Sequence, residues 1–263
     1  MISETCALLD MELYARMRVG NRHDIVAAAS CLRDTVAELC DLRVAPTHNI
    51  ASSRAMIDED GNTLASSVFG FDASEEGWWL APNLALTSPL VALCRLESDP
   101  FWCNANGVWT LGGPRPFGGQ MLGDFAQRAL TNSALVVPVH LPFGQVGAVS
   151  FLPRDPEKTD LSEIFCAFSE LLGIYARQFI ASYARLDRSP RVSRLSPTLT
   201  RREVECLHWA SLGKTNEEIA TILNLTRSTI RFHIRNASEK LDAVNRDQTV
   251  YKAAQLGYLA SGQ

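Results

Sequence analysis

The sequence predicts an α+β protein with an N-terminal α/β/α sandwich around an antiparallel sheet, followed by an all-α domain of four helices. Three observations predict this organisation. Strand and helix patterns are mixed in the first part of the chain, a segment rich in Pro, Ser and Arg interrupts them, and only helical periodicity follows. We therefore expect a first domain at residues 1–186, a linker at 187–197 and a second domain at 198–263.

Composition favours a folded cytoplasmic protein. Of the 263 residues 46% are hydrophobic and 21% charged, which excludes a disordered, collagen-like or coiled-coil chain. The sequence lacks an apolar run of about 18 residues, and its start lacks the basic and apolar segments of a secretory signal. The 7 cysteines are scattered without a C-x-x-C pair, which indicates a reducing compartment and thiols that mostly serve as small apolar fillers.

The first half of the N-terminal domain contains helix, turn and strand signals. Apolar residues recur at helical spacing over Asp24–Leu42, which predicts a helix. Arg54–Asp58 and Thr63–Gly70 flank the sequence Glu-Asp-Gly-Asn, which is typical of a hairpin turn between two strands. Ser88-Pro89 predicts the start of another helix, because serine caps helix N-termini and proline is favoured at the first helical position.

The second half of this domain supplies the centre of the sheet and its longest covering helix. Leu135–His140 and Gln145–Phe151 are apolar, β-branched runs separated by Leu-Pro-Phe-Gly, so they predict a central hairpin. Asp160–Leu186 carries a wide apolar stripe at helical spacing. Strands with helices before and after them indicate one antiparallel sheet covered by helices.

Helix boundaries are well marked after the linker. Thr200–Ser211 is amphipathic, and Thr215–Glu218 forms a capping box that opens a second helix. Asn224–Thr226 is a short turn, and further helices are expected over Thr226–Leu241 and Arg246–Leu259. Two helices joined by a tight turn, the second of them rich in arginine, indicate a helix-turn-helix.

The charge distribution and the third helix point to DNA. Residues 190–263 hold 11 Lys and Arg against 7 Asp and Glu, although the whole chain has a net charge of −4. Ile230, Ile234, Ala237 and Leu241 predict a buried stripe, which leaves the opposite face for the major groove. Arginine bonds guanine edges, an apolar ring contacts a thymine methyl, and a helix N-terminus binds phosphate. The residues expected to contact bases in this way are Arg227, Arg231, Phe232 and Arg235 on the third helix. The residues expected at a phosphate are Lys214 and Thr215 at the start of the second helix. The alternative is a helical packing module with a solvated arginine face.

Several of these segments resemble the LuxR-type DNA-binding domain. They are Leu199–Ala210, Gly213–Ala220, Ile222–Thr226, Thr229–His233 and Lys240-Leu241. The resemblance implies a four-helix module that binds double-stranded DNA as a dimer, on a pseudo-palindromic operator. It implies base contacts by Arg231, Phe232 and Arg235, and contacts on or near the DNA backbone by Lys214, Thr215, Thr229 and His233. For His233, a packed structural role is an equal alternative.

The N-terminal domain resembles the autoinducer-binding domain of quorum-sensing regulators. The matching segments are Ser88-Pro89, Pro100–Trp102, Ala134–Pro138 and Gly144–Ser150. In that family an α/β/α sandwich encloses an acylated lactone between the sheet and one helical layer. Ser88 stands where the family has an aspartate that holds the ligand amide, and serine provides no charged acceptor. We therefore expect a small organic ligand that is not a typical acyl-homoserine lactone.

Aromatic residues cluster in the part of the chain expected to hold this ligand. Four of the 5 tryptophans lie between residues 78 and 109, and large amphipathic indoles are common in pocket walls. The predicted pocket is lined by Phe71, Trp79, Phe101, Trp102 and Ser150, with Ser88 near its polar end. The alternative is an aromatic core without a ligand.

Signals for an enzyme, a cofactor or a metal are absent from the sequence. It contains no P-loop, no H-E-x-x-H and no G-x-S-x-G. Asp58-Glu59-Asp60 indicates a solvated turn rather than a metal site or the phosphoacceptor of a receiver domain.

The sequence as a whole therefore favours a cytoplasmic homodimer that regulates transcription and is controlled by a small organic ligand in its N-terminal domain. The alternative hypothesis is a regulator that binds DNA without a ligand. Its N-terminal domain would then serve for dimerisation or protein interaction.

Overall fold

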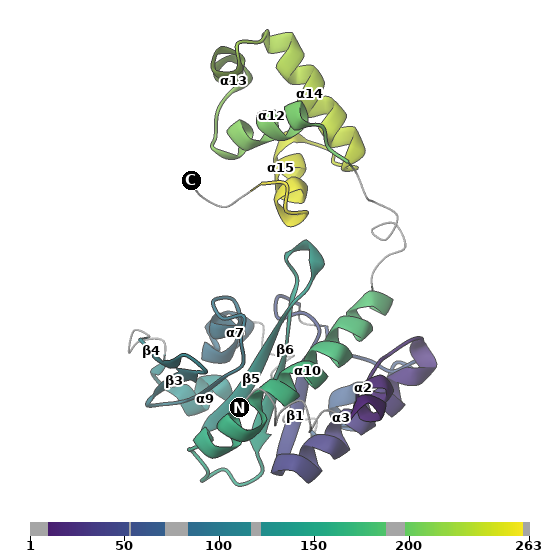
Figure 1. Ribbon diagram of the computed structural model, residues 1–263, viewed down its shortest axis with the longest axis vertical. Coiled ribbons are helices and arrows are strands. Elements are labelled where there is room, and N and C mark those ends of the chain that lie inside the picture. Colours follow the sequence, from purple (N-terminus) through teal and green to yellow (C-terminus); the bar gives the residue numbers. More distant parts are fainter. Residues whose placement is uncertain (1–9, 53, 72–83, 117–121, 188–197, 260–263) are drawn as a thin grey trace. The chain divides into compact units, whose positions relative to one another are not determined.

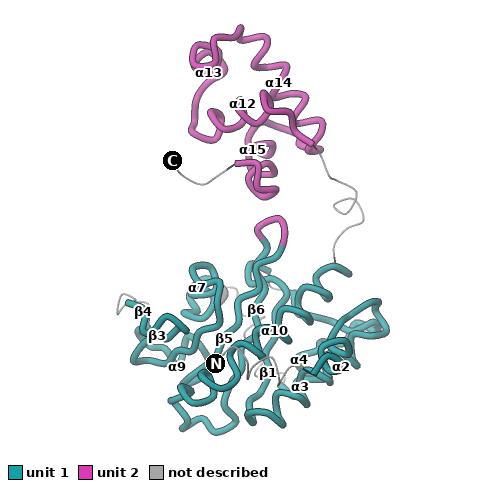
Figure 2. The backbone as a smooth tube through the Cα atoms, viewed as in Figure 1, with its two compact units in different colours: residues 1–141, 145–187 teal, residues 142–144, 188–263 magenta. Residues whose placement is uncertain are grey.

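The structure is a computed structural model that describes residues 10–52, 54–71, 84–116, 122–187 and 198–259 (Figure 1). The chain divides into two compact units (Figure 2). Unit 1 comprises Met1–Leu141 and Gln145–Asp187, and unit 2 comprises Pro142–Gly144 and Arg188–Gln263. Of the predicted linker at 187–197, all but Asp187 lies outside the described residues.

Unit 1 is built on one antiparallel sheet of 6 strands in the order β1-β6-β5-β2-β3-β4. The predicted hairpin is confirmed, because β5 and β6 pair with each other at the centre of this sheet. The strands are β1 (Leu42–Thr47), β2 (Phe101–Asn104), β3 (Gly107–Thr110), β4 (Gly113–Arg115), β5 (Ser133–His140) and β6 (Val146–Pro153).

Strand register assigns each side chain to one face of the sheet. Phe151 of β6 lies opposite Val44 of β1 and Leu135 of β5, so these three side chains share one face. Ser150, the neighbour of Phe151, lies opposite Ala45 and therefore points to the other face. One face thus carries large apolar residues and the other carries smaller ones near β1 and β6.

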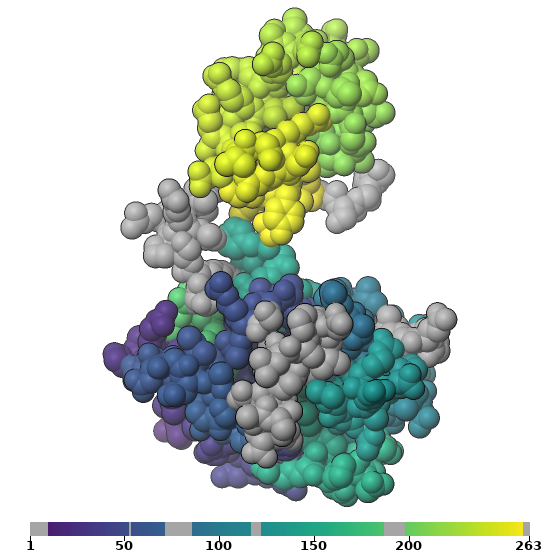
Figure 3. All heavy atoms as spheres, turned by 180° about the vertical axis from the view of Figure 1, so that it is seen from behind, coloured from purple at the N-terminus to yellow at the C-terminus, as the bar shows by residue number. Residues whose placement is uncertain are grey.

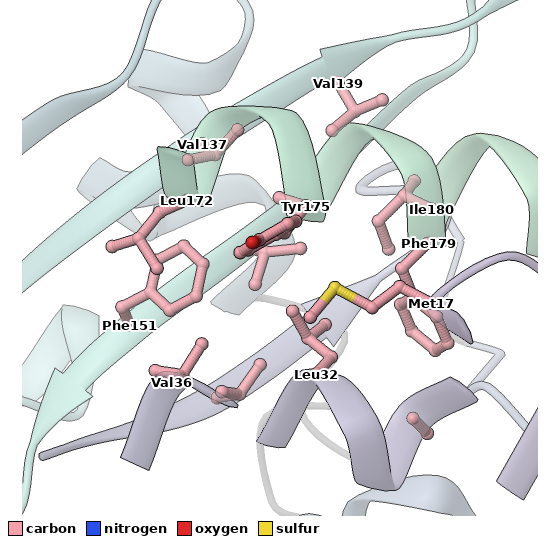
Figure 4. Packing of buried hydrophobic residues seen from close by; sticks show 14 of the residues in the cluster. Met17, Leu32, Val36, Val137, Val139, Phe151, Leu172, Tyr175, Phe179 and Ile180 are labelled. Carbon is pink, nitrogen blue, oxygen red and sulfur yellow. The ribbon is translucent and has the colours of Figure 1, made fainter. Parts of the chain in front are cut away.

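The face with the large residues packs against α10 (Ser162–Asp187) and α3 (Ile25–Cys40). Figure 4 shows Tyr175, Phe179 and Ile180 of α10 pointing into this layer. All three are buried, and they belong to the main apolar core with Leu32 of α3 and Phe151 of β6. By length and composition α10 could cross a membrane, but half of its most apolar window is buried, and packing on the sheet accounts for its hydropathy.

The opposite face carries shorter elements. Leu90 and Val91 of α7 (Pro89–Cys94) and Phe125 of α9 (Phe125–Ala129) join Phe101 and Val136 of the sheet in a second apolar cluster. The sheet therefore has helices on both faces, as the predicted α/β/α sandwich requires. The remaining short helices of unit 1 are α2 (Met11–Arg16), η1 (Arg22–Asp24), α4 (Leu64–Ser67) and α6 (Leu84–Thr87).

The prediction of two strands around residues 54–70 is wrong, although the turn between them exists. Asp58 accepts hydrogen bonds from the N–H groups of Asp60 and Asn62, which closes the turn. A single bridge joins Ile57 to Thr63, and the chain then forms α4 with Leu64 buried. Burial of Leu64 in the main core overrides the strand propensity of this segment.

In unit 1, one predicted helix end and one predicted helix cap differ from the structure. The first long helix, α3, ends at Cys40, because Asp41 adopts a left-handed conformation with φ 51° and Leu42 already begins β1. Pro89 does begin α7 after Ser88, as predicted, but the Ser88 side chain makes no capping hydrogen bond.

Unit 2 contains the four predicted helices. The predicted capping box of Thr215 with Glu218 forms, and the structure adds a second one, Thr200 with Glu203. Asn224 ends the second helix in a left-handed conformation. The final helix ends at Gln255 rather than at Leu259. The helices are α12 (Arg201–Ser211), α13 (Asn216–Leu223), α14 (Arg227–Lys240) and α15 (Arg246–Gln255), and a 3-10 turn, η2 (Pro142–Gly144), completes the described elements. Figure 3 shows α15 in yellow on the surface of unit 2.

Helix α10 packs closely on the sheet at Gly147 of β6. A Cβ atom there would lie 2.6 Å from Ile180 Cγ2 and 2.9 Å from the carbonyl oxygen of Thr47. We expect Gly147→Ala to lower the free energy of unfolding of unit 1 by about 1–3 kcal/mol, because a backbone oxygen cannot move aside. Urea unfolding followed by circular dichroism measures this loss.

Gly112→Ala is the matched control. A Cβ at Gly112 meets nothing nearer than Thr110 Oγ1 at 3.6 Å, which is an ordinary contact. Equal stability losses in the two variants would show that the close packing of α10 on β6 is not the cause.

Candidate functional site

Helix α14 presents one apolar face and one polar face. Thr226 caps it by accepting a hydrogen bond from the N–H of Thr229 at 3.2 Å. Ile230 and Ile234 are buried against α12 and α13, whereas Phe232 on the other side is 53% exposed. An exposed phenyl ring contributes little to a core, so it is available for an apolar contact with a partner.

The three arginines of α14 differ in their partners. Arg227 Nε lies 2.9 Å from Glu217 Oε1 of α13, and Arg235 Nε lies 3.4 Å from Glu239 Oε1. Arg231 is exposed and makes no ion pair or side-chain hydrogen bond with any residue of the described ranges. Its guanidinium therefore keeps all its donors for a bidentate contact with a base edge.

Lys214 and Thr215 meet at the start of α13, where Glu218 holds them. The Glu218 carboxylate accepts the Thr215 N–H at 2.7 Å and lies 3.7 Å from Lys214 Nζ. The backbone hydrogen bond from Thr215, together with its hydroxyl, holds the pKa of Glu218 below its usual range. A DNA phosphate at this helix end would meet Lys214 and the dipole of α13, but it would also lie near a carboxylate.

Thr229 and His233 are half-buried. The Thr229 hydroxyl lies 2.8 Å from that of Thr226, so it takes part in the cap of α14. The His233 ring contacts the Phe232 ring, with centroids 5.7 Å apart. A half-buried ring at this place in α14 is compatible with both alternatives for His233, a contact with DNA and a packed structural role.

An ion pair that sequence reasoning did not single out fixes α14 to α12. Lys240 Nζ lies 2.8 and 2.9 Å from the two carboxylate oxygens of Glu203, which is 3% exposed. Glu203 also accepts the Thr200 N–H at 2.8 Å. Burial raises the pKa of Glu203, but the hydrogen bonds from Lys240 and Thr200 outweigh it and leave that pKa below its usual value.

Unit 1 contains a cavity of about 320 Å³ on the sheet face opposite α10. Its walls are mostly apolar, and small side chains on β1 and β6, Ala45 and Ala148, leave the space. Burial raises the pKa of the Cys94 thiol to about 12, so this part of the wall is also uncharged. The lining residues are Arg43, Ala45, Pro46, Thr47, Ile50, Ala55, Met56, Leu64, Ala65, Phe71, Leu90, Val91, Cys94, Ala129, Leu130, Ala148, Ser150 and Leu152.

Three polar side chains break this apolar wall. Thr47 and Ser150 contribute hydroxyl groups from β1 and β6. The Arg43 guanidinium lies 4.2 Å from the centre of the Phe71 ring and donates a hydrogen bond to the Gly70 carbonyl. The cavity therefore combines a large apolar surface with a few polar groups, as small-molecule sites do.

Of the residues predicted to line a pocket, Phe71 and Ser150 line this cavity. Phe101 lies on the same sheet face but is fully buried in the apolar cluster and does not reach the cavity wall. Ser88 is also fully buried and does not line the cavity, and its hydroxyl has no hydrogen-bond partner among the described residues. Trp79 lies outside the described residues.

The placement of Trp102 in the pocket is wrong. Trp102 pairs with Leu135 of β5, so it points to the face that α10 covers. There its ring stacks on that of Trp109, with centroids 4.0 Å apart.

Sequence reasoning missed Arg43, Ala45 and Thr47. No strand is predicted after the helix that is expected to end at Leu42, so these residues have no assignment in the sequence analysis. Alternation along β1 would have found them, because they are every second residue of one strand.

Comparison with known proteins places the chain among bacterial regulators. Residues 197–253 match the family described as "Bacterial regulatory proteins, luxR family". The chain is 33% identical over 185 residues to the transcriptional activator protein PhzR of Pseudomonas fluorescens, with 68% of this chain and 69% of PhzR covered. It is 38% identical over 125 residues to VanR of Vibrio anguillarum, with 47% of this chain and 50% of VanR covered. The match thus spans about half of VanR.

Among solved structures, the fold is similar to that of SdiA in complex with octanoyl-rac-glycerol. The TM-score is 0.51 at 18% identity, with 95% of each chain covered. A crystal structure of Escherichia coli SdiA gives a TM-score of 0.50 at 19% identity, with 94% of this chain and 95% of that one covered. At these identities the likeness concerns the fold alone.

The buried Glu203–Lys240 pair makes a prediction about the stability of unit 2. We expect Lys240→Met to lower the free energy of unfolding of unit 2 by about 3 kcal/mol at pH 7. This value is at the low end of the range for a broken buried ion pair, because the Lys240 side chain is partly exposed. Since the pKa of Glu203 is lowered in the folded protein, this stability is present above the usual carboxyl pKa and is lost as the pH falls through the lowered value. Urea unfolding as a function of pH measures both effects.

Arg201→Met is the control, because Arg201 pairs with Glu205 at 2.9 Å on the surface and its side chain is 92% exposed. We expect that variant to change stability by less than about 1 kcal/mol. A loss for Lys240→Met that persists unchanged in strong acid would contradict the role of the Glu203 charge.

Proposed function

The chain belongs to the LuxR family of bacterial regulatory proteins, and we propose that it is a cytoplasmic, ligand-controlled regulator of transcription. Unit 2 would bind double-stranded DNA, and unit 1 would bind a small organic ligand. The relatives named above are transcriptional regulators, which agrees with the prediction that the chain is not an enzyme.

The observation that carries DNA binding is the polar face of α14. Arg231, Phe232 and Arg235 are exposed on it, and the opposite side of the helix is buried. In our proposal these three residues contact bases, with Arg227 beside them. Lys214, Thr215, Thr229 and His233 contact the DNA backbone on either side.

We propose that a homodimer binds a pseudo-palindromic operator. One helix-turn-helix module buries too little surface for tight specific binding by itself. Two copies related by a two-fold axis would place their α14 helices in major grooves about one helical turn apart. Sedimentation of the full chain, free and on DNA, distinguishes a dimer from a monomer.

The cavity of unit 1 supports ligand control. Its volume of about 320 Å³ suits a small molecule, and its apolar walls with three polar side chains suit an organic one. Ser88 offers no carboxylate for a ligand amide, so we propose a ligand other than a typical acyl-homoserine lactone.

DNA recognition is tested by removing one guanidinium from α14. We expect Arg231→Ala to weaken binding to the selected operator by about 1–3 kcal/mol and to relax the preference at one base position. Lys214→Ala should instead weaken binding to all sequences. It should also reduce, by about one unit, the slope of the logarithm of the binding constant against the logarithm of the salt concentration. Binding-site selection followed by titration at several salt concentrations measures both. An unchanged sequence preference in Arg231→Ala would exclude this residue as a base reader.

Ligand control is tested by a melting screen together with native mass spectrometry of the protein from its own organism. N-octanoyl-homoserine lactone should raise the melting temperature little. A cognate ligand at 100 times its dissociation constant should instead raise the free energy of unfolding by about 2.7 kcal/mol. Ala148→Leu fills the cavity and should abolish that gain, and Ala167→Leu, exposed on α10, should keep it.

Strong stabilisation by the lactone would show that the loss of the family aspartate does not decide the ligand. Absence of any bound molecule and of any stabilising compound would favour the alternative, in which unit 1 serves for dimerisation or protein interaction.

A further inference from the structure

A second hollow of unit 1 lies on the sheet face that α10 covers, opposite the cavity described above. It is an open groove of about 460 Å³ between strands β2 and β3 and the first turns of α10. We call it the tryptophan groove. Its lining residues are Trp102, Trp109, Thr110, Leu111, Asp160, Ser162, Phe165 and Cys166.

A stacked pair of indoles forms the sheet side of the tryptophan groove. Trp102 of β2 and Trp109 of β3 are directly opposite in the strand register, and their rings lie 4.0 Å apart at 11°. Gly107 makes room for this arrangement, because a Cβ there would lie 3.1 Å from Trp109 Cη2. Trp102 is buried, whereas Trp109 is half-buried. The two rings therefore form a fixed aromatic wall that is partly open to solvent.

A carboxylate stands on the helix side of the tryptophan groove. Asp160 is exposed, and its Oδ1 accepts the Ser162 N–H at 2.8 Å, which holds the side chain at the start of α10. The backbone and hydroxyl hydrogen bonds from Ser162 lower the pKa of Asp160, so the group is ionised at neutral pH. None of the described lining residues is a lysine or an arginine, and the next acidic residue, Glu163, is also exposed.

We propose that the tryptophan groove binds a small organic cation, an ammonium or guanidinium group carried on an apolar body. The negative face of an indole attracts a cation within about 6 Å of its centre. Asp160 adds the opposite charge, and Leu111, which is 54% exposed, adds apolar surface for the body of the ligand. An anion would meet a carboxylate and two electron-rich rings, so the charge of the groove selects against it.

This site is independent of the proposed ligand cavity, because the two hollows lie on opposite faces of the sheet and share no lining residue. A compound bound in the tryptophan groove would contact β2, β3 and α10. It could therefore bind together with a second ligand in the cavity.

The test compares choline with 3,3-dimethylbutan-1-ol, which has the same shape without the charge. Each is titrated into the full chain at neutral pH, and binding is followed by ligand-observed NMR and by the indole N–H signals. We expect choline to bind about tenfold more tightly than the alcohol, since about 1.4 kcal/mol of cation–π and ionic attraction is a factor of ten. The Trp109 signal, assigned from its loss in Trp109→Leu, should shift with choline.

Variants separate charge from shape. Asp160→Asn keeps an acceptor for the Ser162 N–H but removes the charge, and it should weaken choline binding severalfold without a change in melting temperature. Trp109→Leu should also weaken it. Glu157→Gln removes an exposed carboxylate outside the groove and should leave choline binding unchanged, as should the cavity-filling Ala148→Leu.

Three results would overturn the proposal. They are equal affinities for choline and the alcohol, an unchanged choline affinity in Asp160→Asn, and no saturable choline binding to the wild-type chain. Loss of choline binding in Ala148→Leu would assign the cation to the cavity instead.

Discussion

The antiparallel register of β1, β6 and β5 is the constraint on which the rest of unit 1 depends. Because side chains alternate along a strand, a shift of one residue would exchange the two faces of the sheet. In the observed register Phe151 meets α10, and its neighbour Ser150 faces the cavity. Gly147 reinforces this choice, since Ile180 and the Thr47 carbonyl occupy the space that any larger side chain would need. Close packing on one face thereby fixes the position of the smaller residues on the other.

The two faces consequently differ in what they can bind. On one, the short side chains of Ala45 and Ala148 leave an apolar cavity with few polar groups. On the other, α10 covers the centre of the sheet, and Trp102 and Trp109 stack on β2 and β3 beside the start of that helix. The first suits a small molecule with a large apolar surface, and the second suits a cation that can lie against an aromatic wall.

In unit 2 the residues that maintain the fold and the residues that face solvent are separate. Ile230 and Ile234 fix α14 against its neighbours, and Lys240 ties its end to the buried Glu203 of α12. Because these contacts hold the helix from one side, Arg231 and Phe232 on the other side remain exposed. A rigid helix with a solvent-exposed polar face is what a DNA groove requires of a recognition element.

Features that depend on residues close together in the sequence could be predicted from it. The capping box of α13, the apolar stripe of α14 and the hairpin of β5 and β6 all follow from local patterns, and the structure contains each of them. The strand faces that line the cavity do not follow from local patterns, because they depend on how the strands pair. Trp102 lies on the other face from the one predicted, and Arg43 was overlooked, because the face of a residue depends on strands that are distant in the sequence: Arg43 pairs with Leu152, and Trp102 pairs with Leu135. Residues 63–70 became partly helical for the same reason, since burial of Leu64 in a distant core outweighs local strand propensity.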